Sequence, residues 1–236
     1  MNDLEQFFFT EKHRLIHKWN HYFEVYERHL GHLRNQKIIL LEIGISHGGS
    51  LQMWDQYFRG NAAIYAVDIN PECKKFESEN VKIFIGSQED KDFLKYLRSS
   101  IPPVDILIDD GGHTMRQQIL TFEMLFDHIT ENGIYICEDL HTSYWKYFGG
   151  GYKKKRSFVE YSKNFIDSLH AWHRKEVKPD HFTETMHSLH YYDSMLVIEK
   201  RKMGSPFDVK SGEVSIEDET ADKLLVNQNS ETRPSP

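Results

Sequence analysis

The stretch KIILLEIGISHGGS, residues 37–50, joins a run of aliphatic residues to a loop that contains three glycines. Continuous apolar runs of this kind are typical of strands that are buried on both faces of a parallel sheet. Segments with apolar residues at helical spacing separate several such runs, so the sequence predicts an α/β fold with a mainly parallel sheet. The other runs, each ending in or beside a glycine or a carboxylate, are AIYAVDI (63–69), VKIFIG (81–86), VDILIDD (104–110) and GIYICED (133–139).

The C-terminal part of the pattern adds two short strands. HSLHYYDSMLVIEKRK, residues 187–202, contains two apolar runs around a turn at Asp193-Ser194. With the five earlier runs this predicts seven strands. In open α/β sheets ligands bind beyond the carboxyl ends of the strands, where the strand order reverses. The unusual residue clusters of this chain follow strand ends, so the sequence places its function at that edge.

The N-terminal part predicts a helix, because apolar residues recur at steps of three and four over the first 35 residues. His13, His17 and His21 form a row in the same segment, which suits either a solvated helix face or a zinc site that lacks a completing ligand. We expect a helical segment at 1–35, an α/β domain at 36–203, and a polar tail at 204–236 that is flexible without a partner. The apolar helical positions are Leu15, Trp19, Tyr22, Phe23, Tyr26 and Leu30.

Composition narrows the class of protein. The 29 basic and 36 acidic residues give a formal net charge of −7, which argues against a nucleic-acid partner. No apolar stretch reaches the roughly 18 residues of a membrane-spanning helix, and the N-terminus does not resemble a signal peptide. Cys73 and Cys137 are too few for a disulfide framework and suit packed thiols in the cytoplasm. The sequence allows a homo-oligomer without specifying one.

The loop after the first predicted strand favours a nucleoside-containing ligand. It lacks the Gly-Lys-Ser/Thr ending of a P-loop, and Ser46 takes the place of the second glycine of a dinucleotide-binding loop. Asp68 ends the second strand, where an acid commonly accepts hydrogen bonds from both ribose hydroxyls. The alternative is that Asp68 caps the next helix, which starts near Asn70-Pro71. The polar turn at Ser87-Gln88 offers acceptors for an adenine amino group.

Two adjacent acids follow the fourth strand, Asp109-Asp110, and two follow the fifth, Glu138-Asp139. On neighbouring strands about 4.8 Å apart, four carboxylates would repel unless a cation paired with some of them. Hard oxygen ligands with no converging cysteine or lysine favour Mg²⁺, with Mn²⁺ or Ca²⁺ as alternatives. Helix capping would account for one acid per strand and leave two. His113 follows three residues after Asp110, where a general base could take a proton from a hydroxyl.

These motifs resemble the class I S-adenosylmethionine-dependent methyltransferases over roughly residues 37–200. The resemblance implies a Rossmann-like, doubly wound, mainly parallel seven-stranded sheet with helices on both faces and an N-terminal helical extension. Glu42 and Gly44 match the start of that family's first motif, although Ser46 replaces its middle glycine. The cofactor contacts expected here are Glu42, Gly44, Ser46, Gly48, Asp68, Ser87, Gln88 and Asp109.

A narrower resemblance comes from Asp110-Gly111-Gly112-His113 and from the segment 138–145, EDLHTSYW. They are similar to the pattern D-D-G-S-H, then E-D and T-x-Y-W, of the metal-dependent sugar O-methyltransferases of the mycinamicin type, with Gly112 in place of the serine. Those enzymes' large N-terminal extension has no counterpart here beyond the short helical start, so their substrate and assembly contacts are not carried over. The resemblance implies Mg²⁺ at Asp110, Glu138 and Asp139, and His113 as general base. Separately, the aromatic segment predicts acceptor contacts at His141, Tyr144 and Trp145.

The function expected from the resemblance is methyl transfer from S-adenosylmethionine to a hydroxyl of a sugar or glycosylated small molecule, such as a natural product or polysaccharide. Aromatic side chains at 144–152 suit an acceptor-side lid, and the basic run 153–156 suits either that lid or a solvated loop. Two alternatives stay open. A metal-dependent nucleotide-sugar transferase would need a diphosphate-binding device, and a non-catalytic nucleoside-binding protein would not need His113 beside the acids.

Overall fold

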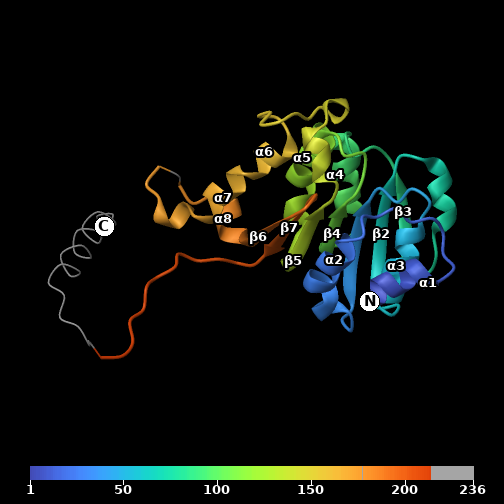
Figure 1. The fold of residues 1–236 in the computed structure, drawn as a ribbon, viewed down its shortest axis with the longest axis horizontal. Helices are drawn as coiled ribbons and strands as arrows, with labels where there is room; N and C mark the ends of the chain where they lie inside the picture. The colour runs from blue at the N-terminus through green and yellow to red at the C-terminus, as the bar shows by residue number, and fades with distance from the viewer. Residues whose placement is uncertain (177, 214–236) are drawn as a thin grey trace. The chain divides into compact units, whose positions relative to one another are not determined.

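A computed structural model of the protein describes residues 1–176 and 178–213. Within these residues seven strands form one sheet in the order β3-β2-β1-β4-β5-β7-β6 (Figure 1). The first five strands are parallel, and β7 is antiparallel to both β5 and β6. This confirms the predicted seven-stranded, mainly parallel sheet. The strands are β1 (Ile38–Ile43), β2 (Ala62–Asp68), β3 (Val81–Ile85), β4 (Val104–Asp109), β5 (Ile129–Cys137), β6 (Met186–Tyr192) and β7 (Met195–Lys200).

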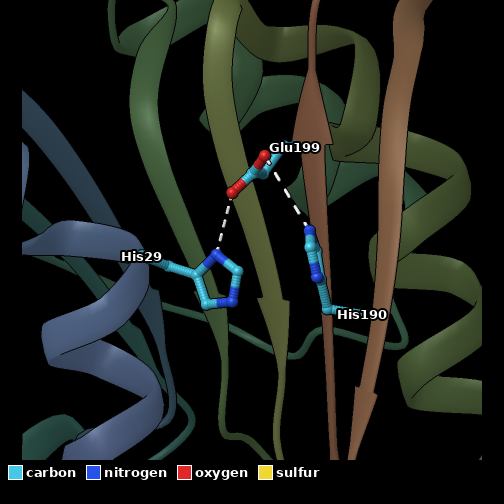
Figure 2. A group of neighbouring side chains, drawn as sticks. All are labelled: His29, His190 and Glu199. Carbon is cyan, nitrogen blue, oxygen red and sulfur yellow. Dashed lines mark hydrogen bonds and ion pairs between the residues drawn. The ribbon is translucent and has the colours of Figure 1, made fainter.

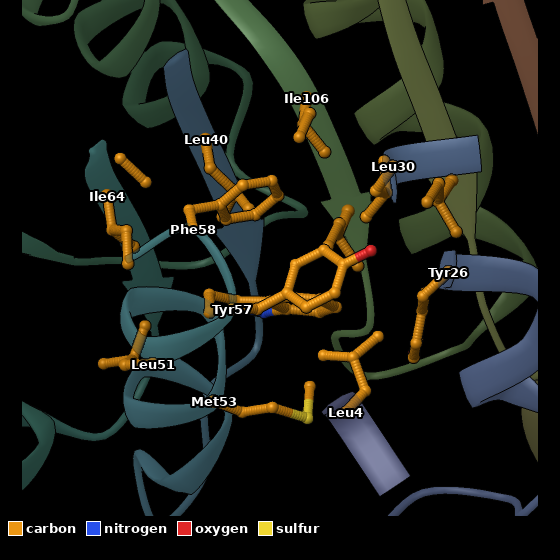
Figure 3. Packing of buried hydrophobic residues seen from close by; sticks show 14 of the residues in the cluster. Leu4, Tyr26, Leu30, Leu40, Leu51, Met53, Tyr57, Phe58, Ile64 and Ile106 are labelled. Atoms are coloured by element: carbon orange, nitrogen blue, oxygen red, sulfur yellow. The ribbon is translucent and has the colours of Figure 1, made fainter. Parts of the chain in front are cut away.

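Helices cover both faces of this sheet, as the apolar strands require. On one face α1 (Asp3–Thr10), α2 (Tyr22–Leu30) and α3 (Gly49–Tyr57) bury a core that includes Leu40 of β1 (Figure 3). On the other face α4 (Lys91–Ser100) and α5 (Met115–Leu125) bury a second core that includes the next residue, Leu41. Successive side chains of a strand point to opposite faces, so β1 contributes to both cores.

Short helices connect these elements, and those between residues 140 and 185 were not predicted from the sequence. Three of them, α6 (Phe158–Ser162), α7 (Asn164–Leu169) and α8 (His181–Thr185), extend the second core over α5, where the ring centroids of Phe122 and Phe165 lie 4.5 Å apart. The 3-10 helices are η1 (Gly31–Leu33), η2 (Pro71–Phe76), η3 (Phe126–His128), η4 (Leu140–Tyr144), η5 (Lys146–Phe148) and η6 (Ala171–His173).

The prediction of continuous helix over the first 35 residues is wrong in its middle. Helices α1 and α2 are separated by residues 11–21, which we call the strap and which contain no helix. The strap is held by Arg14, whose backbone N–H donates to Gln52 (2.8 Å) and whose Nε donates to the carbonyl of Gly48 (3.0 Å). Leu15 and Trp19, expected on the apolar helix face, are 64% and 49% exposed. Tertiary contacts have overridden the local helical pattern.

The strap also removes the row of histidines. His13 bonds to the backbone carbonyls of Phe8 and Arg14, and His21 bonds to that of Asp193. Because residues 13–21 are not helical, their spacing of four no longer places the rings on one face. Within the described part of the chain the three rings form no metal-binding group, so the zinc alternative is wrong.

Residues Met1–Gly204 form one compact unit. Residues 205–213 contain neither helix nor strand, and 214–236 lie outside the described residues. The proposed boundaries at 35/36 and 203/204, and the flexible tail, therefore stay predictions. Among the described helices, none is both long and apolar enough to cross a membrane.

Candidate active site

A cavity of about 360 Å³ lies at the carboxyl edge of the sheet, where the strand order reverses between β1 and β4. Its volume is in the range of small-ligand pockets. The loops after β1 to β5 line it together with the strap. The predicted site residues in its wall are Gly44, Ser46, Asp68, Ser87, Gln88, Asp110, His113 and Asp139.

The loop after β1 passes so close to the loop after β4 that only glycine fits at its start. Gly44 has φ of 86°, and a Cβ there would lie 2.2 Å from the carbonyl oxygen of Asp110. The side chain of Asp68 holds this loop, because one of its oxygens accepts from the backbone N–H groups of Ile45 (3.0 Å) and Ser46 (2.9 Å). Asp68 thus faces the cavity loop.

The alternative role of Asp68 as a helix cap is not what the structure shows. The side chain of Asn70 caps η2 by accepting from the N–H of Glu72 at 3.0 Å. Asp68 instead accepts from the N–H of Asn70 at 2.8 Å, which shapes the turn before that helix.

Three predicted cofactor residues, Glu42, Gly48 and Asp109, lie behind the cavity wall. The buried Glu42 carboxylate accepts from the Ser50 hydroxyl (2.9 Å) and the Trp54 indole (3.3 Å), which ties β1 to α3. Burial raises the pKa of Glu42 to about 7. Its structural contribution is to fix the helix that begins at the glycine loop.

Gln88 and Asp109 form a second buried support. The Gln88 amide nitrogen donates to Asp109 and to Thr121, both at 3.0 Å, and its oxygen accepts from the N–H of Gly112 at 2.8 Å. Burial raises the pKa of Asp109 to about 7, and its Oδ2 has no hydrogen-bond partner among the described residues. Both ends of the Gln88 amide therefore hold the loop that carries His113.

The acids after β4 and β5 lie together, as expected for parallel neighbours. Helix α5 is capped by Thr114 in a capping box with Gln117, and Asp139 makes no side-chain cap at η4. Helix capping thus accounts for neither Asp110 nor Asp139, and the carboxylates need another partner.

The partner is a lysine, so the expectation that no lysine converges on these acids is wrong. The strap carries Lys18 into the cluster, where its Nζ lies 2.6 Å from Asp110 Oδ2 and 2.8 Å from Glu138 Oε2. The Lys18 side chain is only 2% exposed. Burial alone would lower the pKa of Lys18, but the two carboxylates hold it well above its ordinary value, so it stays a cation.

Helix α2 supplies two hydroxyls to the same cluster. Tyr26 donates to Glu138 Oε1 at 2.5 Å, and Tyr22 donates to Asp139 Oδ1 at 2.8 Å. Both oxygens of Glu138 are therefore engaged, and burial together with nearby Asp110 raises its pKa to about 7. The sequence analysis missed this set, although Lys18, Tyr22 and Tyr26 are spaced by four and could have signalled it.

His113 faces the free oxygens of this cluster. Its Nε2 lies 3.4 Å from Asp139 Oδ2 and 3.8 Å from Asp110 Oδ1. Burial lowers the pKa of His113 despite the acids around it, which favours a neutral ring that can accept a proton at neutral pH. Ser46, His113 and Asp139 all have φ between 47° and 57°, a costly conformation for residues other than glycine that clusters at functional sites.

The three predicted acceptor residues lie beyond the cavity wall. His141 Nδ1 lies 2.5 Å from the Ser194 hydroxyl, and its ring contacts Trp145 at 4.5 Å and Trp19 at 5.6 Å between centroids. The side chains of Tyr144 and Trp145 are about half exposed. The strap, through Trp19, thus shares an aromatic surface with the segment after β5.

A family profile described as a methyltransferase domain matches residues 41–140, the span from β1 to the acids after β5. The part of the chain that carries the cavity loops thus resembles a methyltransferase domain. Its sheet and cavity have the arrangement that the class I resemblance implied, and both that resemblance and the narrower mycinamicin-type one are confirmed.

The curated relatives that this chain matches are named as O-methyltransferases. The chain is 34% identical over 78% of its length to 8-demethyl-8-alpha-L-rhamnosyl tetracenomycin-C 2'-O-methyltransferase of Streptomyces olivaceus, and covers 52% of that protein. It is 31% identical over 85% of its length to mycinamicin VI 2''-O-methyltransferase of Micromonospora griseorubida, again covering 52%. The chain therefore spans about half the length of these relatives.

A solved structure of the methyltransferase MycE from the mycinamycin biosynthetic pathway, in complex with Mg, S-adenosylhomocysteine (SAH) and mycinamycin VI, is similar in fold. The TM-score is 0.75 at 30% sequence identity, over 85% of this chain and 53% of that one.

Proposed function

We propose that the chain is an S-adenosylmethionine-dependent O-methyltransferase that acts on a hydroxyl of a sugar or glycosylated small molecule. The observation that carries this proposal is a partly buried His113 whose Nε2 faces free carboxylate oxygens in a cavity that is also lined by the glycine loop held by Asp68. The named activities of the curated relatives support the same reaction class and a glycosylated acceptor.

We assign the nucleoside end of the cofactor to Asp68 and Ser87, and its methionine end to the loop of Gly44 and Ser46. Glu42 and Asp109 would act as positioning residues from behind the cavity wall, Gln88 would hold the loop of His113 from within the wall, and Gly48 would serve the turn into α3. When bound, S-adenosylmethionine would supply an electrophilic methyl group. His113 would take the proton of the acceptor hydroxyl at Nε2, and the fixed geometry of the two reactants would supply much of the acceleration.

The free groups of the cluster fit a divalent cation. Asp110 and Asp139 each offer a carboxylate oxygen, and these oxygens lie within 4.8 Å of one another, which leaves the His113 nitrogen beside them free to act as the base. Two carboxylates make a hard donor set that suits Mg²⁺, with Mn²⁺ or Ca²⁺ as alternatives. Bound there, the cation would lower the pKa of an acceptor hydroxyl. Glu138, the third predicted ligand, would reach a cation through Oε2 only after Lys18 withdrew.

The acceptor side is proposed from the aromatic surface of Trp19, His141 and Trp145, with Tyr144 beside it. Aromatic faces and edges suit the apolar faces of sugar rings. A cytoplasmic location, the absence of a nucleic-acid partner and a homo-oligomer stay predictions.

Calorimetry of the full chain with SAH, NAD and a UDP-sugar, each with and without Mg²⁺, tests the proposal. SAH should bind with and without Mg²⁺, whereas NAD and a UDP-sugar should bind at least 10-fold more weakly. Tighter binding of the UDP-sugar would favour the nucleotide-sugar transferase. Cofactor binding without turnover, on a panel of rhamnosylated acceptors that a relative methylates, would favour a non-catalytic binding protein.

A further inference from the structure

A second group of metal-type ligands lies away from the cavity, where helix α2 meets strands β6 and β7. It consists of His29 from α2, His190 from β6 and Glu199 from β7 (Figure 2). The three ligand atoms lie within 4.8 Å of one another, and His29 is buried. Neither the domain profile nor the proposed reaction uses these residues. We propose that they form a binding site for Zn²⁺ that clamps α2 to the β6–β7 hairpin.

The distances suit a tetrahedral ion with modest adjustment. His29 Nδ1 lies 2.9 Å from Glu199 Oε1, and His190 Nε2 lies 3.8 Å from Glu199 Oε2. Ligand bonds of about 2.0–2.2 Å in a tetrahedral site place neighbouring ligand atoms roughly 3.3 Å apart. The two observed distances lie on either side of that value. Two imidazoles and one carboxylate are also a donor set that zinc accepts, with water at the fourth position.

The surroundings of His29 suit a metal ligand. Burial lowers the pKa of His29, which favours the neutral ring that ligates a metal. Without metal, the proton on Nδ1 donates to Glu199, and Nε2 accepts from the Tyr192 hydroxyl at 2.8 Å. With metal on Nδ1, the ring proton moves to Nε2 and donates to the Tyr192 oxygen, which fixes the ring in its ligating orientation.

Ser188 completes the surroundings from β6. Its hydroxyl lies 3.0 Å from Glu199 Oε2 and 2.9 Å from His190 Nε2. Zinc would displace the hydroxyl from the imidazole nitrogen and leave its hydrogen bond to the carboxylate. The three ligands come from α2, β6 and β7. A bound ion would therefore join α2 to a hairpin far along the chain, since Glu199 lies 170 residues after His29.

The test uses full-length protein stripped of metal by a chelator and titrated with Zn²⁺ or Co²⁺ alone. The metal should bind stoichiometrically, raise the melting temperature, and with Co²⁺ give the visible absorption of a tetrahedral site. His190→Gln and Glu199→Gln should each weaken this binding at least 10-fold. Both variants keep hydrogen-bonding groups in place, so they test metal binding with little effect on folding.

Two control variants separate this site from other zinc-binding groups. His32→Ala removes an exposed histidine near α2, and Asp139→Asn disables the cluster at the cavity; both should keep the tight Co²⁺ spectrum. Wild-type affinity in His190→Gln and Glu199→Gln would overturn the proposal. Loss of tight binding in Asp139→Asn alone would also overturn it, because the ion would then belong to the cavity. A wild-type protein that binds no zinc would show that the cluster is only a hydrogen-bonded network.

Discussion

The acids at the cavity and the histidines at the hairpin are both clusters of metal-type ligands, and helix α2 contributes to each. It places Tyr22 and Tyr26 on the acids and His29 in the other cluster. The clusters differ in composition. The cavity cluster combines three carboxyl groups with the Lys18 ammonium, whereas the hairpin cluster combines one carboxyl group with two imidazoles.

The difference shows two ways of holding buried ligands. Buried like charges must be neutralised, and at the cavity the chain does so with a cation of its own, Lys18. At the hairpin, the His29 ring and the Ser188 hydroxyl donate hydrogen bonds to the carboxylate of Glu199, in place of a lysine. The first cluster should therefore depend on charge and the second on hydrogen-bond geometry.

If only the cavity cluster takes part in the reaction, substitution of His113 should have the largest effect on the catalytic rate. His113→Ala should lower kcat about 10²–10⁴-fold, because the acceptor hydroxyl loses its general base. The residual rate should rise with pH as hydroxide replaces that base, which steady-state kinetics from pH 6 to 9 would measure. His170→Ala, an exposed matched control, should keep the wild-type rate. A similar rate for His113→Ala would reduce that residue to loop structure.

Lys18 provides the sharpest test of the charge argument. Lys18→Met keeps the apolar stem but leaves two buried carboxylates without their cation, so the free energy of unfolding should fall by about 3–5 kcal/mol at neutral pH. Added Mg²⁺ should restore part of the loss. Urea denaturation with and without Mg²⁺ measures both. Lys95→Met breaks an exposed pair with Asp92 and should cost less than about 1 kcal/mol. Equal stability of the two variants would contradict the assignment of Lys18 as counterion.

Asp68 lies on the opposite wall of the cavity, and its substitution tests whether this carboxylate contributes to cofactor binding through hydrogen bonds. Asp68→Ala should weaken SAH binding by about 1.5–3 kcal/mol, the scale of a lost hydrogen bond to a charged group. Asp68→Asn keeps one acceptor oxygen for the loop N–H groups and should lose less. Calorimetry measures both, with the exposed Asp92→Ala as control. Unchanged affinity in a folded Asp68→Ala protein would remove this residue from the cofactor site.

The smallest effect concerns pH, through Glu42. Burial raises its pKa from 4.5 to about 7, so the folded state binds more protons than the unfolded chain between these values. Its contribution to stability is therefore greatest at low pH and is lost as the pH rises through about 7. Glu42→Gln should gain roughly 1–3 kcal/mol relative to wild type between pH 5 and 8. The exposed Glu24→Gln should show no such trend in urea denaturation, and a flat difference for Glu42→Gln would contradict the pKa shift.

Much of the sheet could be predicted because its signals are local. The apolar run and terminal carboxylates of β4 lie within seven residues, and parallel pairing then brings Asp110 and Asp139 to one edge. The strap could not be predicted in the same way. Its residues have helical spacing, and contacts with residues far along the chain, such as Gly48 and Gln52 more than 30 residues away, hold them in another conformation.

The sequence predicted that the acids of the candidate site lie together, but it did not predict their counterion. Four acids in two pairs signal a need for positive charge, but nothing local links them to a lysine 92 and 120 residues earlier in the chain. Glu42 and Gln88 were expected to contact the cofactor, whereas their observed hydrogen bonds support neighbouring elements, for a related reason. A motif gives the position of a polar residue, whereas burial and hydrogen-bond partners decide whether it faces a ligand or supports a loop.

Because of the strap, the part of the chain after residue 35 does not by itself contain the whole candidate site. The domain boundary expected at 35/36 separates, in sequence, groups that lie within 3 Å of one another at the cavity. A chimera of two related proteins joined at that boundary would take Lys18, Tyr22 and Tyr26 from one parent. It would take the glycine loop and the acids from the other parent, so the acids would lose the lysine with which they normally pair. A chimera that takes residues 11–26 and 37–145 from the same parent keeps the whole site together.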